Sequence, residues 1–278
     1  TRAAHDDDCG CRQCQGVSRE TRADDDGVDD EPAELGKVRR RRQKLAADYL
    51  PLYEDVAKRV TKREVADIRR AVGKQLRRRS AAEFRLWLDA FYREFVDVLI
   101  EQFDPLMRTY AAQVVTAAAD ELDEEDPGVT EEILDFIAAY LAAFAAGYAA
   151  AGLNQLQAVM ADAEEAGEDV GDALERRLDE WDEKKASKTA LRQAYEAMNA
   201  VTVAQYRVFG VLSLIWLARG KSCPYCRGLN GKKVSINDYF VQKGQSIAGG
   251  ADDEPMKVRG SKRYGPLHRG CDCTVAAG

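Results

Sequence analysis

The sequence predicts a mainly α-helical protein in which long helices precede a small C-terminal β-hairpin element. Three observations support this fold class. Alanine, leucine, glutamate and arginine dominate long stretches, and there are only 7 prolines in 278 residues. Apolar residues recur at three- and four-residue steps over much of the chain. After Gly210 this pattern stops, and short apolar runs separated by glycine turns take its place.

The predicted organisation has three parts. Residues 1–36 form an acidic tail, 37–188 a helical domain with basic N-terminal helices, and 189–278 a C-terminal domain. Because the tail is polar and nearly free of large apolar groups, its composition is typical of disorder. It also holds four potential metal ligands within ten residues, which form a possible second metal site: His5, Cys9, Cys11 and Cys14. The alternative is a flexible tail whose thiols have no role.

Charge is unevenly distributed along the chain. Residues 37–93 hold 18 basic and 7 acidic residues, a net charge of +11, against −7 for the whole chain. Two arginine runs contribute most strongly, Arg39, Arg40, Arg41 and Arg42 and then Arg77, Arg78 and Arg79. Clustered arginines can bind nucleic-acid phosphates whatever the base sequence, or an acidic protein surface. The alternative is a solvated helix face, which is the usual role of charge runs.

Helix signals follow the basic region. Ser80 and Glu83 form a capping box that predicts a helix start, and Thr130 is expected to cap a later helix. A kink is expected at Pro105, because proline removes an internal hydrogen bond. Between Ser80 and Pro105 an apolar stripe predicts a packed helix face, formed by Phe84, Trp87, Leu88, Phe91, Phe95, Val98, Leu99 and Phe103.

Residues 136–153 form an uncharged run of 18 residues. This length reaches the lower limit for a membrane span. However, the run is rich in alanine, contains two tyrosines and is not followed by a basic flank. We therefore expect a helix buried in a bundle or a subunit contact, and no membrane span.

The remaining elements lead to the C-terminus. Residues 161–188 predict a charged helical segment broken near its glycines, and helix is expected again from about Thr189 to Phe209. Val211–Leu217 predicts a strand, and Lys232–Ile236 predicts the returning strand of a hairpin. Residues 243–265 are rich in glycine and charge and predict a loop.

Five potential metal ligands lie in the C-terminal domain, in the patterns Cys-x2-Cys and His-x2-Cys-x-Cys: Cys223, Cys226, His268, Cys271 and Cys273. Soft thiolates with one imidazole suit tetrahedral zinc, so four of these five are expected to bind it. The spacing favours Cys271 over Cys273 for the fourth place. Such a site is structural by default, because protein side chains fill every position. A disulfide or free buried thiols are the alternatives.

An ordered set of C-terminal motifs resembles the phage Mu F-like family of minor head, or head-morphogenesis, proteins of tailed bacteriophages. A helix with Ala194-Tyr195-Glu196 ends near Gly210, and a short strand holds Trp216. Three motifs follow in order: Cys223-Pro224-Tyr225-Cys226, Leu229-Asn230-Gly231, and the segment from Pro266 to Val275. In that family the last motif usually has arginine between its two cysteines, whereas this chain has Asp272. The match covers residues 189–276.

The resemblance implies a non-enzymatic structural protein of the virion. It would lie inside the capsid near the portal, after assembly in the host cytoplasm, and act in head assembly and genome packaging or delivery. The implied partners are the phage portal protein, other head proteins, further copies of the chain and packaged double-stranded DNA bound through its phosphates.

No catalytic residue is predicted. The alternatives are a His-Asn-His-type nuclease and a zinc-containing DNA-binding protein. The nuclease needs a catalytic histidine besides its metal ligands, yet His5 and His268, the two histidines of the chain, both lie in cysteine clusters. A sequence-specific reader needs a basic recognition helix beside the metal, but the basic residues of this region are expected on loops and strands.

Overall fold

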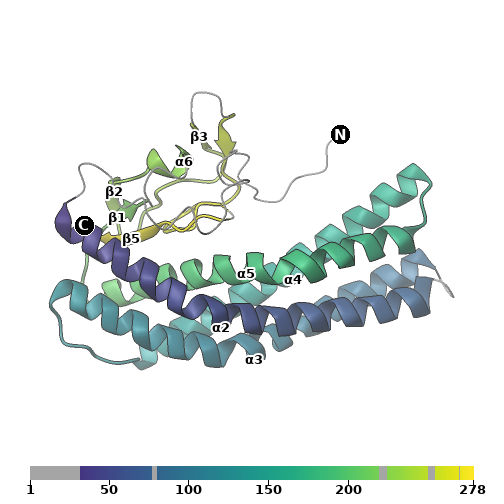
Figure 1. Ribbon diagram of the computed structural model, residues 1–278, viewed down its shortest axis with the longest axis horizontal. Coiled ribbons are helices and arrows are strands. Elements are labelled where there is room, and N and C mark those ends of the chain that lie inside the picture. The colour runs from purple at the N-terminus through teal and green to yellow at the C-terminus, as the bar shows by residue number, and fades with distance from the viewer. Residues whose placement is uncertain (1–31, 77–79, 219–223, 250–253, 269) are drawn as a thin grey trace. The chain divides into compact units, whose positions relative to one another are not determined.

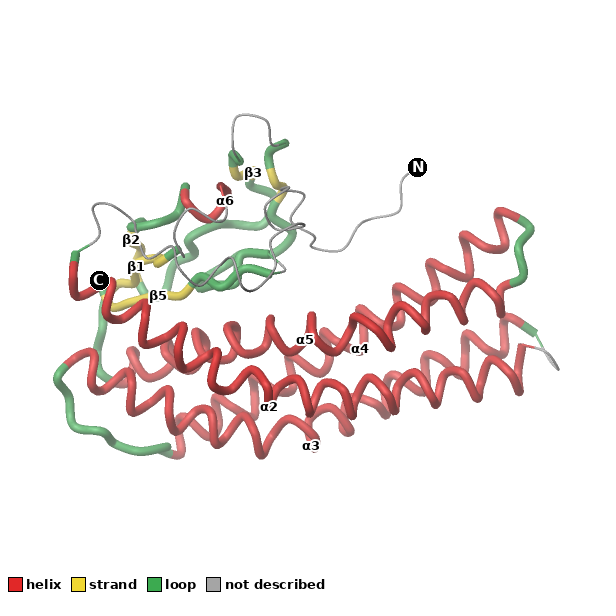
Figure 2. The backbone as a smooth tube through the Cα atoms, in the orientation of Figure 1, coloured by secondary structure: helices red, strands yellow, loops and turns green. Residues whose placement is uncertain are grey.

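The computed structural model describes residues 32–76, 80–218, 224–249, 254–268 and 270–278. Four long helices dominate, and short strands are confined to the C-terminal part of the chain (Figure 1, Figure 2). The fold class predicted from the sequence is therefore confirmed. The long helices are α2 (Ala33–Ala71), α3 (Ala81–Leu122), α4 (Glu131–Ala166) and α5 (Val170–Val208).

The helix ends follow local signals. The backbone N–H of Glu83 donates to Ser80 Oγ at 3.3 Å, and that of Ile133 donates to Thr130 Oγ1 at 3.4 Å, so both predicted caps are present. Gly167, with φ of 66°, ends α4 in a conformation that favours glycine. Three of the helices extend beyond the predictions. Helix α2 already begins at Ala33, α3 continues through Pro105, and α5 is continuous across the expected start at Thr189.

The chain divides into two compact units, each built from distant segments. The first unit comprises Thr1–Leu50, Tyr110–Ile133 and Leu191–Gly278, and the second comprises Pro51–Thr109 and Leu134–Ala190. Each long helix contributes to both units. The units therefore combine separate stretches of sequence, unlike the consecutive ranges 37–188 and 189–278.

In the second unit the interior is formed by the predicted apolar stripe of α3 and by one face of α4. Phe84, Leu88 and Phe95 of α3 are at most 2% exposed. Ile137 and Leu141 of α4 are buried to the same degree. These residues recur at three- and four-residue steps, so each helix presents one continuous apolar side to the core.

A cluster of polar side chains is buried within the second unit. The Glu64 carboxylate is fully buried and pairs with Lys185 Nζ at 2.8 Å and 2.9 Å from its two oxygens. The hydroxyls of Tyr92 and Tyr148 each donate to this carboxylate at 2.7 Å. Lys185 Nζ also lies 3.5 Å from the ring centroid of Trp181. The buried charge is thus compensated by an ion pair and two hydrogen bonds.

A second buried ion pair lies in the first unit. Arg42 of α2 donates to Glu121 Oε2 of α3 at 2.6 Å, and neither side chain is more than 3% exposed. The same Glu121 oxygen accepts a hydrogen bond from the Tyr206 hydroxyl at 2.6 Å, and Arg42 also donates to Thr202 Oγ1. Burial alone would lower the pKa of Arg42, but the charges of Glu121 and Tyr206 and their hydrogen bonds together outweigh it, and the pKa is raised. The guanidinium therefore stays charged.

The C-terminal part of the first unit contains a three-stranded antiparallel sheet in the order β2-β1-β5. The central strand β1 (Ser213–Leu217) pairs with β2 (Lys233–Ser235) and with β5 (Thr274–Ala277). The hairpin predicted from residues 211–217 and 232–236 is therefore confirmed. Trp216 of β1 is fully buried and packs its ring edge-on against Phe240, which anchors the sheet in its own core.

The prediction of a loop over 243–265 was wrong in one respect. This segment contains two short strands, β3 (Ser246–Ile247) and β4 (Met256–Lys257), which pair antiparallel. Val258 is 5% exposed and joins the apolar core of the C-terminal element. The pairing depends on contacts between residues nine and eleven positions apart, which the composition of the segment does not reveal.

Among the described residues, α4 is the one helix long and apolar enough to cross a membrane, judged by length and composition alone. Of its most apolar 18-residue stretch, 28% is buried. The exposed positions of this stretch are alanines and glycine, with small side chains. The absence of a membrane span stays a prediction, and the expected burial in a bundle holds for one face of the helix.

Candidate metal centre

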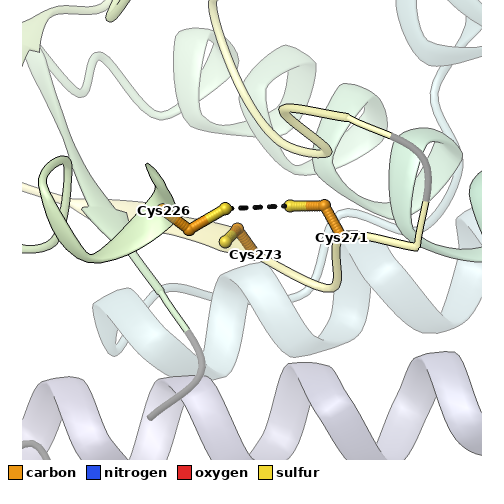
Figure 3. A group of neighbouring side chains, drawn as sticks. All are labelled: Cys226, Cys271 and Cys273. Atoms are coloured by element: carbon orange, nitrogen blue, oxygen red, sulfur yellow. Dashed lines mark hydrogen bonds between the residues drawn. The ribbon is translucent and has the colours of Figure 1, made fainter. Parts of the chain in front are cut away.

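Three cysteine thiols converge inside the C-terminal element. Cys226 lies on the short helix α6 (Pro224–Arg227), whereas Cys271 and Cys273 precede β5. Their sulfur atoms all lie within 4.8 Å of one another, and Cys226 Sγ is 3.6 Å from Cys271 Sγ (Figure 3). None of the three residues is more than 4% exposed. A group of this kind can hold a metal ion.

His268 adds a nitrogen donor beside the thiols. Its Nε2 atom lies 3.4 Å from Cys226 Sγ, and the residue is 7% exposed. The sequence analysis treated Cys271 and Cys273 as alternatives for one place, with Cys271 preferred. The structure brings both thiols to the cluster, and the imidazole of His268 lies beside one of its members, Cys226.

The thiols differ in acidity. Burial acts to raise the pKa of Cys271, but hydrogen bonds with Cys226 and Cys273 and the charge of His268 outweigh it, and the pKa lies well below its ordinary value. A hydrogen bond with Cys226 acts to lower the pKa of Cys273. Burial and the neighbouring Cys271 thiolate outweigh it, and this pKa lies well above its ordinary value. The site thus favours the deprotonated form of Cys271 and opposes deprotonation of Cys273. A bound cation would remove that opposition, because a metal deprotonates its thiol ligands.

The loop that carries His268, Cys271 and Cys273 is fastened to α5 by Asn199. This fully buried side chain donates from Nδ2 to the carbonyls of Gly265 and Cys273, both at 3.0 Å. Its Oδ1 accepts a hydrogen bond from the Thr274 hydroxyl at 2.8 Å. These hydrogen bonds therefore fix two points of the loop next to the thiols, one at Gly265 and the other at Cys273 and Thr274.

The same loop needs glycine at position 265. A Cβ atom there would lie 2.5 Å from the carbonyl oxygen of Cys273, far inside contact distance. The sequence analysis did not single out Asn199 or Gly265. The signal for Asn199 was a polar residue in the midst of the apolar positions of its helix, flanked by Met198 and Val201.

Contacts on the other side of the cluster fix α6. The Tyr225 hydroxyl donates to the carbonyl of Glu254 at 2.7 Å, and Asn230 Oδ1 accepts the backbone N–H of Ala218 at 2.8 Å. The N–H of Gly231 donates to the carbonyl of Trp216 at 2.9 Å, which closes the turn back onto β1. Hydrogen bonds therefore hold the segment that carries Cys226 at both its ends.

Several predicted site residues lie outside the described part of the chain. Cys223, the fifth ligand candidate of the C-terminal domain, is one of them. The possible N-terminal metal site of His5, Cys9, Cys11 and Cys14 also falls there, as does the second arginine run, Arg77, Arg78 and Arg79.

The first arginine run requires a correction as a nucleic-acid-binding group. Arg39 is 3% exposed and its guanidinium lies 3.5 Å from the carbonyl oxygen of Ala218, while Arg42 is fully buried against Glu121. Arg40 and Arg41 are exposed. Four consecutive residues point around the whole circumference of a helix, so one run cannot present all its side chains to a partner.

Comparison with known proteins gave no match to any protein family, any curated protein or any solved structure. The metal centre therefore rests on the geometry of this chain alone. The likeness to phage head proteins rests on the C-terminal motifs.

Proposed function

We propose that this chain is a non-enzymatic structural protein of a tailed-phage head, with a C-terminal element that a zinc ion holds together. The observation that carries the proposal is the convergence of Cys226 with Cys271 and Cys273, from segments more than 40 residues apart, with the imidazole of His268 next to Cys226. These residues belong to the ordered motifs that resemble the minor head proteins. Their meeting at one buried point gives those motifs a physical purpose.

Distances between the donor atoms support zinc as the metal. With zinc–sulfur bonds of about 2.3 Å in a tetrahedron, two thiolate sulfurs lie about 3.8 Å apart. The sulfurs of Cys226 and Cys271 are 3.6 Å apart, and the imidazole of His268 is 3.4 Å from Cys226 Sγ. A donor set of thiolates with one imidazole is also the usual choice of zinc.

The surroundings of the cluster support a structural role for the metal. Three thiols and one imidazole supply four protein ligands, which leaves no position for a reacting water. All four residues are at most 7% exposed. The strands beside them are short, with five, three and four residues in β1, β2 and β5. So small a sheet buries little surface, and a metal would add the stability that it lacks.

The proposed place of the protein is the interior of the capsid near the portal. There it would contact the portal protein, other head proteins and further copies of itself, and act in head assembly and in packaging or delivery of double-stranded DNA. The long helices would supply the surfaces for these contacts.

The metal is tested with the Cys226→Ser variant of the full chain. We expect elemental analysis to find one zinc ion in the C-terminal element of the parent protein and none in the variant. Near-ultraviolet circular dichroism should show loss of C-terminal packing, while far-ultraviolet helicity is mostly kept. A parallel protein lacking residues 1–31 separates this zinc from any bound by the N-terminal cysteines.

Tyr225→Phe is the matched control, because it alters the neighbouring residue of α6 and removes the hydrogen bond to Glu254 without removing a thiol. It should retain zinc. Parent protein without zinc, or a Cys226→Ser variant with undiminished zinc, would contradict the proposed metal centre.

The place in the particle is tested by electron cryomicroscopy of phage particles that carry the protein. We expect density for the helices at the portal vertex, in a ring whose symmetry matches the portal. Particles with complete heads that lack this protein at that vertex would rule out the proposed role.

A further inference from the structure

In the second unit, the exposed side of α2 is basic from residue 58 onward, whereas the preceding turns expose Leu52 and Asp55. From residue 58 to residue 74, through the end of α2 into the π-helical turn Val72–Leu76, eight residues are exposed. Six of them are lysine or arginine, none is acidic, and the other two are Ala66 and Gly73. We call the six the α2 basic row: Lys58, Arg59, Lys62, Arg63, Arg70 and Lys74.

Helical spacing places these residues on one broad side of α2, since each step of four residues advances about 40° around the helix. Lys58, Lys62 and Arg70 lie at multiples of four residues, and Arg59 and Arg63 form a parallel pair one position further on. Residues four apart lie on the same face of an α-helix. From Lys58 to Arg70 the row extends about 18 Å, at a rise of 1.5 Å per residue.

The row keeps most of its charge. Asp67, a partly buried neighbour, lies 2.6 Å from Arg70 and 3.8 Å from Arg63. Arg59 contacts the neutral amide of Gln102 at 3.5 Å. By contrast, the nearby Arg69 is engaged by carboxylates of α5 and does not belong to the row. Arg59 also lines a surface hollow together with Asp55 and Glu101. The six positive charges still outnumber these neighbouring carboxylates, so the row remains positive.

The chemistry of the row identifies its partner. A protein partner or a lipid surface would need large apolar side chains at the centre of the contact. The exposed positions from 58 to 74 provide only Ala66, and the exposed Leu52 precedes the row. Single-stranded nucleic acid would need aromatic side chains for base stacking, and these are also missing from the exposed positions. Regularly spaced cations without large apolar or aromatic groups fit the phosphate backbone of a duplex.

We propose that the α2 basic row binds the phosphate backbone of double-stranded DNA without regard to base sequence. This replaces the arginine run at 39–42 as the site of DNA contact. The exposed side chains of α3 and α5 in the same unit include many acids, such as Glu94, Asp97, Asp182 and Glu183. These faces repel phosphates, so the duplex contacts the unit along α2. The proposal rests on the proposed function only for the choice of DNA as the natural polyanion.

The test uses the full chain and 30-base-pair duplexes of two unrelated sequences, with binding measured by fluorescence anisotropy from 50 to 200 mM NaCl. The variant carries Lys58→Gln, Arg59→Gln, Lys62→Gln and Arg63→Gln. Each lost phosphate contact reduces the slope of log K against log salt by about 0.9, so the slope should become shallower by about 3 to 4. Affinity at 100 mM NaCl should fall at least about tenfold, equally for both sequences.

The matched control removes the same number of positive charges, four, from α3 and α5. It carries Arg93→Gln, Arg108→Gln, Lys184→Gln and Lys188→Gln, all exposed in the second unit. It should keep nearly all affinity. An equal loss in both variants, an unchanged slope in the α2 variant, or strong preference for one duplex would overturn the proposal. The proposal would also be overturned if sedimentation showed that the row mediates only salt-sensitive self-association of the protein.

Zinc content is measured in the same preparations. Zinc without duplex binding would refute the α2 row and leave the metal centre intact. Duplex binding without zinc would refute the metal centre alone.

Discussion

The basic residues at the start of α2 and those further along the same helix differ in what their charges do. In the first stretch Arg42 is buried against Glu121, and Arg39 is buried beside the carbonyl of Ala218. In the second stretch the cations are exposed and the buried charge is an anion, Glu64, which Lys185 of α5 neutralises. One stretch thus uses arginine to hold its own unit together, and the other leaves its cations for a partner.

Basic residues that are consecutive in sequence and basic residues spaced four apart therefore predict different structures. Consecutive arginines are easily seen in a sequence. On a helix, however, they point around the circumference, so some face the core and others the solvent. Charges spaced by four residues are less conspicuous, yet they share one face and add their fields. For a helical protein, the spacing of basic residues predicts a binding surface better than their density does.

The largest effect is expected from Arg42→Ala. Because it leaves the Glu121 carboxylate buried without its cation, we expect the free energy of unfolding to fall by about 3 to 5 kcal/mol. Urea denaturation followed by circular dichroism measures this change. Arg41→Ala is the control, since its ion pair with Asp120 is exposed and should contribute about 1 kcal/mol or less. Equal losses in the two variants would show that burial does not separate these arginines.

An intermediate effect is expected from Glu64→Gln in the second stretch. The amide oxygen can still accept from one of the two tyrosines, Tyr92 or Tyr148, but its NH2 group cannot accept from the other, and Lys185 loses its buried counter-charge. We expect the free energy of unfolding to fall by about 2 to 3 kcal/mol. The adjacent Lys62→Gln, in the exposed row, should change it by about 0.5 kcal/mol at most. If Glu64→Gln left the free energy of unfolding unchanged, the expected contrast between buried and exposed charges in this stretch would be wrong.

The smallest effect is expected from Tyr206→Phe, which removes the hydroxyl that donates to Glu121. We expect a loss of about 1 kcal/mol at pH 7. Burial raises the pKa of Tyr206, and the Glu121 charge and hydrogen bond add to this, while Arg42 opposes it. Since the folded pKa is above the unfolded value of about 10, the parent protein loses stability as pH rises beyond about 10.

Urea midpoints between pH 8 and pH 11 test this dependence. Tyr206→Phe should lose less stability over that interval than the parent protein does. Tyr239→Phe, at a tyrosine that is 43% exposed, should follow the parent curve. Parallel curves for all three proteins would show that Tyr206 does not couple to the ion pair.

Local signals predicted local structure well. Ser80 and Thr130 cap α3 and α4 as expected, because a cap is a hydrogen bond to a backbone group three residues away. The strand that holds Trp216 and its returning partner were predicted for the same reason, since a hairpin joins neighbours in sequence. The convergence of Cys226 with Cys271 could be predicted because thiols in such spaced pairs are typical of metal sites.

Tertiary contacts decided what the sequence left open. The roles of Asn199 and Gly265 depend on a close approach between α5 and a loop about 70 residues later, which no local pattern encodes. The pairing of Glu64 with Lys185 likewise joins residues 121 apart. Both thiols, Cys271 and Cys273, reach the cluster because the loop is fastened at Gly265 and Thr274, a constraint that spacing alone does not show.

By itself, the sequence determined the helical character of this protein, the caps of its helices, the hairpin and the candidate metal donors, since these follow from backbone propensity and side-chain chemistry. Only the tertiary structure decided which charges are buried and which are exposed. An arginine in either setting has the same local sequence signature, and the free energy of burying its charge depends on whether a distant carboxylate reaches it.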